Sequence, residues 1–422
     1  MIYLLHENIT ASGILSENDV RDICKNAFER AALDGKKVLF IIPDSTRSGP
    51  IDMMFRVIYE QMIDRVNRMD FLIALGTHPA MSEMAINKRI GVSAYDRSTR
   101  YARTRIYNHA WNDPDQLITV GTLSAGEVKE ISGGLMNEPV SITMNKLVLE
   151  YEVLVIVGPV FPHEVVGFSG GNKYLFPGIA GKEIIDMFHW LGALMTNPAI
   201  IGKKKTPVRE VVNRAAQMVP IRRLCFSMVV SGYDLAGLFF GTPEEAWEKA
   251  ADLSGKLHIV YKDHPFRSVL SCAPEMYDDL WVGGKSMYKL EPVVANGGEV
   301  IIYAPHITEI SATHGALIRQ IGYHTRDYFL KQPEKFRHIP GGVKAHSTHV
   351  RGIGTYENGV ESPRIDVILA TGISEAICRE INLGYRDPAE IDPAEWQNRE
   401  EEGFLYVSKA GEILYRLKND PF

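Results

Sequence analysis

Histidine, lysine and glycine residues lie close together in the sequence between His163 and His189. His163 precedes a glycine-rich turn, Lys173 follows that turn, and His189 falls within the next apolar, helix-like run. An imidazole can move protons or bind a metal near neutral pH, and a lysine can pair with a phosphate. The glycines leave backbone N–H groups able to face an anion. We therefore expect an anion or cofactor site here, formed by Gly167, Ser169, Gly170, Gly171 and Lys173.

This turn matches neither of the two common nucleotide-binding patterns. Asn172 precedes the lysine and Tyr174 follows it, so the P-loop sequence is not met. The dinucleotide-binding glycine fingerprint is also missing from the segment. A phosphate- or nucleotide-binding transferase that uses residues 167–173 without a metal stays open as an alternative.

Polar side chains follow three predicted strands at the point where each strand ends. Apolar, β-branched runs at 38–42, 71–75 and 153–157 are typical of buried strands. The polar residues that follow them are Asp44 and Arg47, His78, and His163 with Lys173. Ligands of open α/β sheets bind at the carboxyl ends of the strands. We therefore expect these side chains to share one site.

The alternation of strand-like and helix-like segments predicts an α/β protein with two domains and an active site in the cleft between them. The polar stretch 256–264, which ends at Pro265, is the predicted junction. We expect an N-terminal cofactor-binding domain at 1–262 and a C-terminal α/β domain at 263–390, with strands at 299–303 and 366–370. Residues 391–422 resemble a hairpin that packs back on the N-terminal domain. Residues 335–363, rich in Gly and His, are predicted to be a long connection.

Composition excludes several classes of function. The 422 residues carry a net charge of −6, which argues against nucleic acid as the main partner. The four cysteines are scattered without a CxxC pair, so we expect reduced thiols and a cytoplasmic protein. We find no secretory signal and no apolar run of membrane-spanning length. A small-molecule ligand is the remaining expectation.

The central pattern, HxxxGxSGGxKxxxPG with a later histidine, resembles the lactate racemase family, whose members carry a nickel-pincer nucleotide. Similar segments are PDSTR at 43–47, LGTH at 75–78 and the stretch 285–298. The resemblance implies a racemase or epimerase of a 2-hydroxy acid that works by reversible hydride transfer. It also implies transient contact with the enzymes that mature the cofactor.

The resemblance also implies a role for each matching residue. His78 and His163 would be the two catalytic acid–base groups, one for each enantiomer. Lys173 would hold the cofactor covalently through a thioamide, and His189 would be the protein ligand of Ni(II). Imidazole and a planar geometry both suit that ion. Asp44 would orient Arg47 or a ring nitrogen.

Arg47 and Lys285 are the candidates for binding the substrate carboxylate. Three positions before Lys285 stands Val282, where lactate racemase has a substrate-contacting glutamine. The active-site tryptophan of that enzyme has no clear counterpart. We therefore expect a 2-hydroxy acid larger than lactate, with a sugar acid epimerised at C2 as the alternative.

A second set of histidines lies in the C-terminal half. Its members are His306, His314, His346 and His349. They could ligate a metal, hydrogen-bond a polyhydroxylated substrate together with Arg351, or serve only to join domains. A non-catalytic homologue that binds cofactor or metabolite is the third functional alternative for the whole chain.

Overall fold

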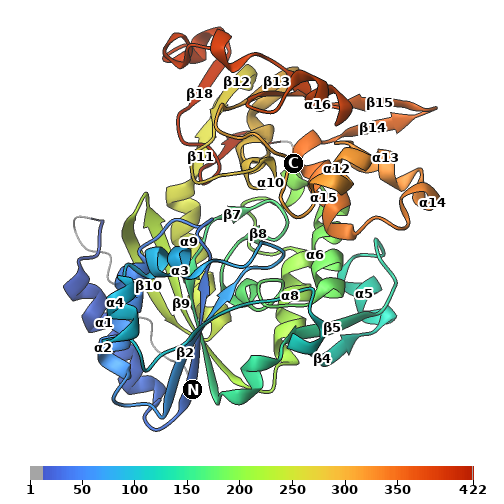
Figure 1. The fold of residues 1–422 in the computed structure, drawn as a ribbon. Helices are drawn as coiled ribbons and strands as arrows, with labels where there is room; N and C mark the ends of the chain where they lie inside the picture. The colour runs from blue at the N-terminus through green and yellow to red at the C-terminus, as the bar shows by residue number, and fades with distance from the viewer. Residues whose placement is uncertain (1–12, 421) are drawn as a thin grey trace. The chain divides into compact units, whose positions relative to one another are not determined.

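The chain forms two units, and each is assembled from separate segments of the sequence (Figure 1). The computed structural model describes residues 13–420 and 422, so the first twelve residues, where a secretory signal would begin, lie outside it. The first unit runs to Phe161 and adds Ser169–Ile185 and Arg209–Leu257. The second contains Pro162–Phe168, Asp186–Val208 and everything from His258. This division differs from the single boundary predicted after residue 262, because short excursions of the chain leave no signal in composition.

A six-stranded sheet is the centre of the first unit. Its order is β10-β9-β6-β1-β2-β3, and every neighbouring pair is parallel except β10 with β9. The strands are β1 (Lys37–Pro43), β2 (Arg68–Ala74), β3 (Ile106–Asn108), β6 (Val153–Pro159), β9 (Arg222–Ser231) and β10 (Asp234–Gly241). β6 is buried throughout, as a central strand of a parallel sheet should be. The three strands predicted from apolar runs are confirmed.

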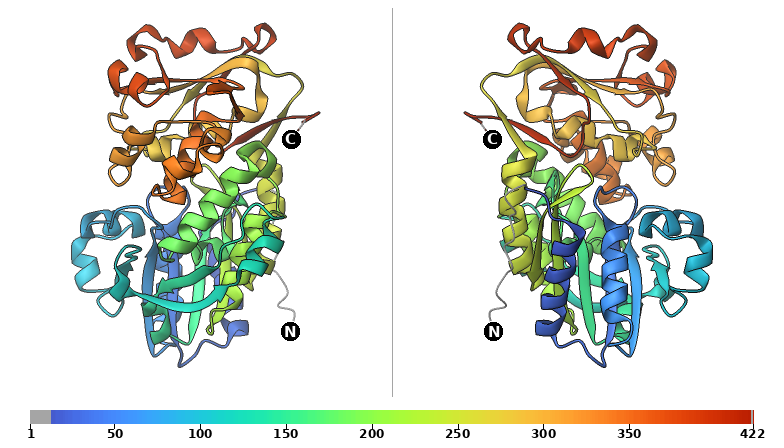
Figure 2. Two further views of the ribbon diagram at one scale, coloured as in Figure 1. Left: turned by 90° about the vertical axis from the view of Figure 1, so that its right-hand side faces the viewer. Right: turned by 90° about the vertical axis from the view of Figure 1, so that its left-hand side faces the viewer.

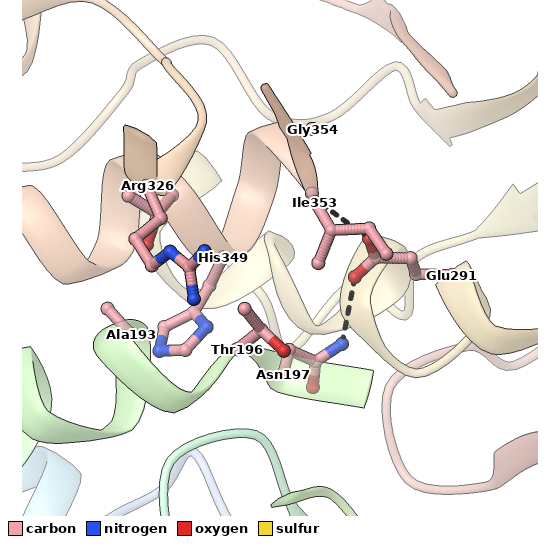
Figure 3. A pocket seen from close by; sticks show the side chains of 10 residues that line it. Ala193, Thr196, Asn197, Glu291, Arg326, His349, Ile353 and Gly354 are labelled. Carbon is pink, nitrogen blue, oxygen red and sulfur yellow. Dashed lines mark hydrogen bonds between the residues drawn. The ribbon is translucent and has the colours of Figure 1, made fainter. Parts of the chain in front are cut away.

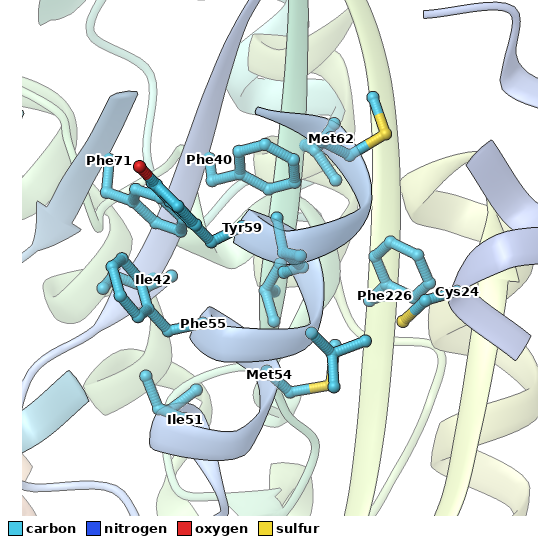
Figure 4. Close-up of a cluster of buried hydrophobic side chains, with 14 of the residues drawn as sticks. Cys24, Phe40, Ile42, Ile51, Met54, Phe55, Tyr59, Met62, Phe71 and Phe226 are labelled. Carbon is cyan, nitrogen blue, oxygen red and sulfur yellow. The ribbon is translucent and has the colours of Figure 1, made fainter. Parts of the chain in front are cut away.

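Two helices cover one face of this sheet, as the right-hand view of Figure 2 shows. α1 (Glu17–Ala31) begins with a capping box, in which the side chains of Ser16 and Asp19 accept from each other's backbone N–H groups. α2 (Ile51–Met62) packs Phe55 against Phe71 of β2 in the apolar cluster of Figure 4. The buried thiol of Cys24 belongs to the same cluster. All four cysteines are free, as expected.

The first unit also contains three further α-helices and a two-stranded antiparallel sheet. They are α3 (Glu83–Ile90), α4 (Ala94–Ser98), α5 (Ala125–Ile131) and the antiparallel pair β4 (Leu117–Leu123) with β5 (Val140–Asn145). The chain passes between the units within α6 (Lys182–Met195), α8 (Pro207–Gln217) and α9 (Pro243–His258). In the part of the chain that the structure describes, no helix is both long and apolar enough to cross a membrane.

A five-stranded parallel sheet is the centre of the second unit. Its order is β17-β16-β13-β12-β18. The strands are β12 (Phe266–Cys272), β13 (Val294–Ala304), β16 (Asp366–Thr371), β17 (Gly384–Tyr385) and β18 (Phe404–Val407). The strands predicted at 299–303 and 366–370 are confirmed. The helices of this unit are α7 (Asn197–Ile200), α10 (Leu280–Gly283), α11 (Lys285–Tyr288), α12 (Gly315–Ile321), α13 (Arg326–Leu330), α14 (Pro333–Phe336), α15 (Gly341–Arg351) and α16 (Glu375–Glu380).

The predicted C-terminal hairpin is wrong. β18 adds to the edge of the five-stranded sheet beside β12, whereas β19 (Leu414–Leu417) pairs in parallel with β11 (Ile259–Lys262). Between them, the N–H of Ala410 donates to the carbonyl of Cys272 at 2.9 Å. Residues 391–422 belong to the second unit, which also contains β11, a strand inside the predicted N-terminal range 1–262. Turn-forming residues favour a local pairing, but each of these strands finds a longer-range partner.

The predicted connection at 335–363 is also wrong. It contains α15 and the antiparallel pair β14 (Gly354–Glu357) with β15 (Val360–Pro363). α15 begins with two glycines, which disfavour a helix by themselves. Its later residues are nevertheless buried, including Val343, Ala345 and Val350. Tertiary packing therefore overrides the weak local propensity of this segment.

Candidate active site

The loops after β1 and β2 bring Asp44 and His78 into contact within the first unit. Pro43, at the end of β1, is the register partner of Ala74, at the end of β2, so the two loops start side by side. Oδ2 of Asp44 lies 2.5 Å from Nδ1 of His78. The other oxygen, Oδ1, accepts hydrogen bonds from the N–H of Thr46 at 3.1 Å and from its hydroxyl at 2.7 Å. Both carboxylate oxygens are thus occupied.

The charge of Asp44 determines which nitrogen of His78 carries the proton. Burial alone would raise the pKa of Asp44, but the His78 ring, the Arg47 guanidinium and the Thr46 hydroxyl together hold that pKa well below its ordinary value. An ionised carboxylate can only accept hydrogen bonds, so Nδ1 of neutral His78 must be the donor. Nε2 of His78 is then unprotonated. With its side chain 26% exposed, His78 can act as a general base toward a ligand.

Arg47 lies beside this pair. Its Nη1 donates to the hydroxyl of Thr46 at 2.9 Å, and its own carbonyl accepts from Nη2 of Arg89 at 2.9 Å. Arg47 contributes electrostatically to the low pKa of Asp44. The predicted proximity of Asp44, Arg47 and His78 is therefore present in the structure. Their arrangement places a base next to a fixed positive charge.

Lys173 belongs to a tightly supported turn of the first unit. It lies in the short 3₁₀ helix Gly171–Tyr174, where it is partly exposed although its three companions are buried. Ahead of the turn, the N–H of Ser169 donates to the carbonyl of Phe161 at 2.7 Å, and its hydroxyl accepts from the Phe161 N–H at 2.9 Å. Both polar groups of Ser169 therefore hold the turn in shape.

Two side chains from much later in the sequence support the same turn. Nε1 of Trp247 donates to the carbonyl of Ser169 at 2.8 Å, and Nη1 of Arg209 donates to that of Gly170 at 3.2 Å. The Arg209 guanidinium stacks 4.2 Å from the Trp247 ring centroid, and burial lowers the pKa of Arg209 to about 9. A Cβ at Gly171 would come within 2.9 Å of Trp247. Neither Arg209 nor Trp247 lies in a motif, so their part in this turn could not be predicted from sequence patterns.

A hydrogen bond links the His78 loop to the segment that follows Lys173. The N–H of Gly76 donates to the carbonyl of Gly178 at 2.9 Å. Tyr174 follows Lys173 in the sequence and is buried against Gly158 of β6. A Cβ added to Gly158 would overlap the Tyr174 ring. The predicted association of the His78 loop with the Lys173 turn is therefore present within the first unit.

His163 belongs to the second unit, in the strand pair β7 (Pro162–His163) with β8 (Gly167–Phe168). Gly167, its register partner, has φ +85°, and a Cβ there would lie 1.8 Å from the carbonyl oxygen of Lys203. Nδ1 of His163 accepts the N–H of Val165 at 3.1 Å. A neutral His163 must therefore carry its proton on Nε2. Oε2 of Glu164 also lies 3.2 Å from Nδ1 and would pair with the ring once it is protonated.

His189 lies on α6, partly exposed, and interacts with histidines of the same unit. Burial lowers the pKa of His346 well below its usual value, and His349, His314 and His189 lower it further. Trp281, next to Val282, stacks on His346 with the ring centroids 4.0 Å apart and lies 4.4 Å from His314. Three of the four histidines left unassigned by the sequence thus form one group.

Lys285 and His306 both contact Tyr277 in the second unit. Nζ of Lys285, at the start of α11, lies 4.6 Å from the centroid of the Tyr277 ring. The side chain of His306 contacts the carbonyl of Tyr277 at 3.1 Å. Among the described residues, no three His, Cys, Asp or Glu side chains converge as a metal-binding group.

Sequence comparisons with known proteins find similarity to lactate racemases. A family model described as the lactate racemase N-terminal domain matches residues 17–201. Lactate racemase of Thermoanaerobacterium thermosaccharolyticum is 24% identical over 300 residues, covering 67% of this chain and 65% of that enzyme. Lactate racemase of Lactiplantibacillus plantarum is 24% identical over 196 residues, covering 46% of this chain and 41% of the enzyme. These alignments span less than two thirds of either enzyme.

Solved structures extend the similarity to nearly the whole chain. A Thermotoga maritima protein, determined as a structural-genomics target, is 35% identical with a TM-score of 0.89, over 96% of this chain and 99% of that one. The lactate racemase apoprotein of T. thermosaccharolyticum has the same fold, with a TM-score of 0.72 at 19% identity over 96% and 93% of the two chains. The protein is therefore of the α/β class that these structures share. The chain is similar in sequence to the lactate racemase family, through the N-terminal domain at 17–201 and through both enzymes named above.

Proposed function

We propose that this protein is a racemase or epimerase that inverts the carbinol carbon of a 2-hydroxy acid. The observation that carries the proposal is the 2.5 Å contact between Asp44 and His78 at the carboxyl ends of two parallel strands. The carboxylate keeps the proton on Nδ1, so Nε2 can accept the proton of a substrate hydroxyl. Inversion at carbon needs such a base for one enantiomer and a matching acid for the other.

His163 is the proposed counterpart of His78. Its Nδ1 accepts a backbone N–H, so the neutral ring presents a proton on Nε2 instead of a lone pair. One ring is therefore set to take a proton and the other to give one, and the two exchange these states in the reverse direction. An imidazole has a pKa near neutrality and can serve in both roles.

The side chains of Lys173 and His189 fit the nickel-pincer nucleotide that the family resemblance implies. Lys173 is partly exposed on a turn braced by Trp247 and Arg209, which suits a covalent attachment point. His189 offers an imidazole, a donor that suits Ni(II), and the organic part would supply the remaining donors. When bound, such a group supplies a reversible hydride acceptor. Its attachment also implies transient contact with maturation enzymes.

Arg47 and Lys285 are proposed to bind the substrate carboxylate. A guanidinium can hold both oxygens of a carboxylate, and an ammonium adds a mobile point charge. Val282 is buried and apolar where the resemblance expects a glutamine, so a donor for a small acid is missing. We therefore propose a substrate larger than lactate, with a sugar acid as the alternative.

Holoenzyme, produced together with the cofactor-maturation enzymes, tests these assignments. We expect intact-mass analysis to find a covalent adduct on Lys173 with stoichiometric nickel. Lys173→Ala should lose the adduct, whereas His189→Ala should keep the adduct and lose nickel. A panel of lactate, malate, phenyllactate and aldonic acids then identifies the substrate. Full nickel and activity in both variants would overturn the cofactor assignment, and fastest turnover of lactate would overturn the size argument.

A further inference from the structure

A small polar cavity lies within the second unit, enclosed by α6, α7, α13, α15 and the segment before β14 (Figure 3). Its volume is about 50 Å³. At roughly 10–15 Å³ for each water-sized group, this is room for a few non-hydrogen atoms. The residues that line it and carry the argument are Ala193, Thr196, Asn197, Glu291, Arg326 and His349.

Two buried side chains at this cavity have polar atoms without a hydrogen-bond partner among the described residues. They are Oδ1 of Asn197 and Nε2 of His349, in side chains that are only 2% and 4% exposed. The orientation of the Asn197 amide is fixed, because its nitrogen donates to the carbonyl of Tyr288 at 2.8 Å and to Glu291 at 3.1 Å. Oδ1 is therefore an acceptor that needs a donor. Leaving such atoms unsatisfied is costly, so a ligand that bonds them has a clear advantage.

Thr196 gives an independent sign that this cavity is functional. Its backbone has φ +74° and ψ +144°, a region that β-branched residues rarely occupy. Strained conformations of this kind persist where the surrounding structure enforces them, and they cluster at binding sites. Thr196 lines the same cavity and precedes Asn197. The strain therefore coincides with the two unpartnered atoms.

The charges at the cavity restrict what it can bind. Arg326, whose Nη1 donates to the carbonyl of Leu194 at 2.9 Å, disfavours a cation. Glu291 is fully buried, with its two oxygens accepting from Asn197 and from the N–H of Ile353 at 2.7 Å, and together with the Asn197 oxygen it disfavours an anion. A hydroxyl group is neutral, and it both donates and accepts. We infer that this cavity binds a pair of neighbouring hydroxyl groups.

The cavity lies next to the proposed nickel ligand along the chain. His189 and Ala193 are four residues apart on α6, so they lie on the same face of that helix, one turn from each other. The hydroxyl pair could thus belong to a free polyol or to the far end of a polyhydroxylated 2-hydroxy acid. The second source rests on the proposed function, whereas the hydroxyl site itself does not.

Erythritol is the probe, and its binding to the whole protein can be followed by saturation-transfer NMR, which needs neither nickel nor turnover. We expect saturable binding below about 100 mM, the affinity of roughly one net hydrogen bond. Ala193→Leu fills the cavity, and His349→Phe removes the unpartnered nitrogen while keeping a ring. Each should weaken binding about tenfold or more. Ile353→Val is the matched control, because it trims a lining side chain without touching a polar group, and it should bind normally.

The results of the erythritol experiment test both the existence of the site and its ligand. Absence of saturation, or equal binding by wild type and both variants, would overturn the site. If Ala193→Leu fails to fold, as judged by its unfolding transition, His349→Phe still decides. Tighter binding of inorganic phosphate or acetate than of erythritol would overturn the assignment to hydroxyl groups. Displacement of erythritol by gluconate assigns the site to a substrate tail, and simultaneous binding of both assigns it to a free polyol. A failure of racemase activity leaves each of these results unaffected.

Discussion

His78 and His163 each follow a buried strand in the sequence, β2 and β6, but their Nδ1 atoms have opposite hydrogen-bonding roles. In the first unit, Nδ1 of His78 faces the carboxylate of Asp44 at 2.5 Å. In the second unit, Nδ1 of His163 accepts the backbone N–H of Val165 at 3.1 Å. The two neutral rings therefore have opposite tautomers. The sequence alone did not distinguish these two histidines, but in the structure their neutral rings carry the proton on different nitrogens.

Removing the imidazole of His78 or of His163 should have the largest effect on kcat. We expect His78→Gln and His163→Gln each to lower kcat of the holoenzyme by about 10²–10⁴-fold, the usual contribution of a general acid or base. The equilibrium constant fixes the ratio of kcat/KM in the two directions, so both directions should slow together. Isomer interconversion can be followed by chiral chromatography, with adduct and nickel content measured in parallel. A variant that keeps its cofactor and turns over at the native rate would remove that histidine from the mechanism.

The carboxylates of Asp44 and Glu164 should differ strongly in their effect on kcat. Asp44→Asn allows an amide N–H to face Nδ1 of His78, which would turn that ring into the tautomer of His163. We expect kcat to fall by roughly 100-fold, with the change of tautomer visible in the ¹⁵N shifts of the ring. Glu164→Gln is the matched control. It should change kcat by less than about threefold, because Val165 already sets the His163 tautomer. Equal losses in the two variants would contradict the comparison.

Local patterns were enough to predict three of the six strands of the first sheet and the proximity of Asp44 to His78. Apolar β-branched runs located β1, β2 and β6, and the topology of parallel strands then brought Asp44 to His78. The supports of the Lys173 turn could not be predicted in this way. Arg209 and Trp247 act on it from 36 and 74 residues further along the chain. The C-terminal hairpin was predicted wrongly for the same reason, because β18 and β19 pair with strands that are distant in the sequence.

The polar cavity could not be predicted from the sequence, for a further reason. Asn197, Glu291, Arg326 and His349 are spread over some 150 residues, and none lies in a recognisable motif. Their chemistry arises only when the tertiary fold buries them together. His349 was one of the four C-terminal histidines singled out in the sequence. The spacing of these histidines could not, however, distinguish a ligand site from core packing.

Burial of neutral histidines should make both units sensitive to acid. Burial lowers the pKa of His109, in the first unit, to about 4 and that of His349, in the second, to about 3. An unfolded chain protonates each at its ordinary pKa near 6.5, so stability is complete above that pH and falls as the pH drops toward 4 or 3. At pH 5 each should cost about 2 kcal/mol of unfolding free energy relative to pH 8.

Denaturant unfolding at pH 8 and pH 5 measures this loss. His109→Gln and His349→Phe remove one buried imidazole from each unit, and each should reduce the difference between the two pH values. His264 is exposed to solvent, so His264→Gln is the control and should leave the pH dependence unchanged. An unaltered difference in either buried-histidine variant would show that its ring does not stay neutral in the folded unit.

The smallest expected effects contrast two residues with positive φ, one in each unit. Ala32, exposed at the C-terminal cap of α1, has φ +51° and ψ +57°, a conformation that glycine adopts more readily. Thr196 has φ +74° and ψ +144° and lines the polar cavity. Ala32→Gly and Thr196→Gly should each raise the unfolding free energy by roughly 0.5–1 kcal/mol, because relief of strain exceeds the entropy cost of glycine. Only Thr196→Gly should also weaken erythritol binding, since the strained backbone fixes the threonine hydroxyl and the neighbouring amide at the cavity. A stabilised Thr196→Gly protein with unchanged erythritol affinity would mean that the strain at Thr196 does not serve the cavity.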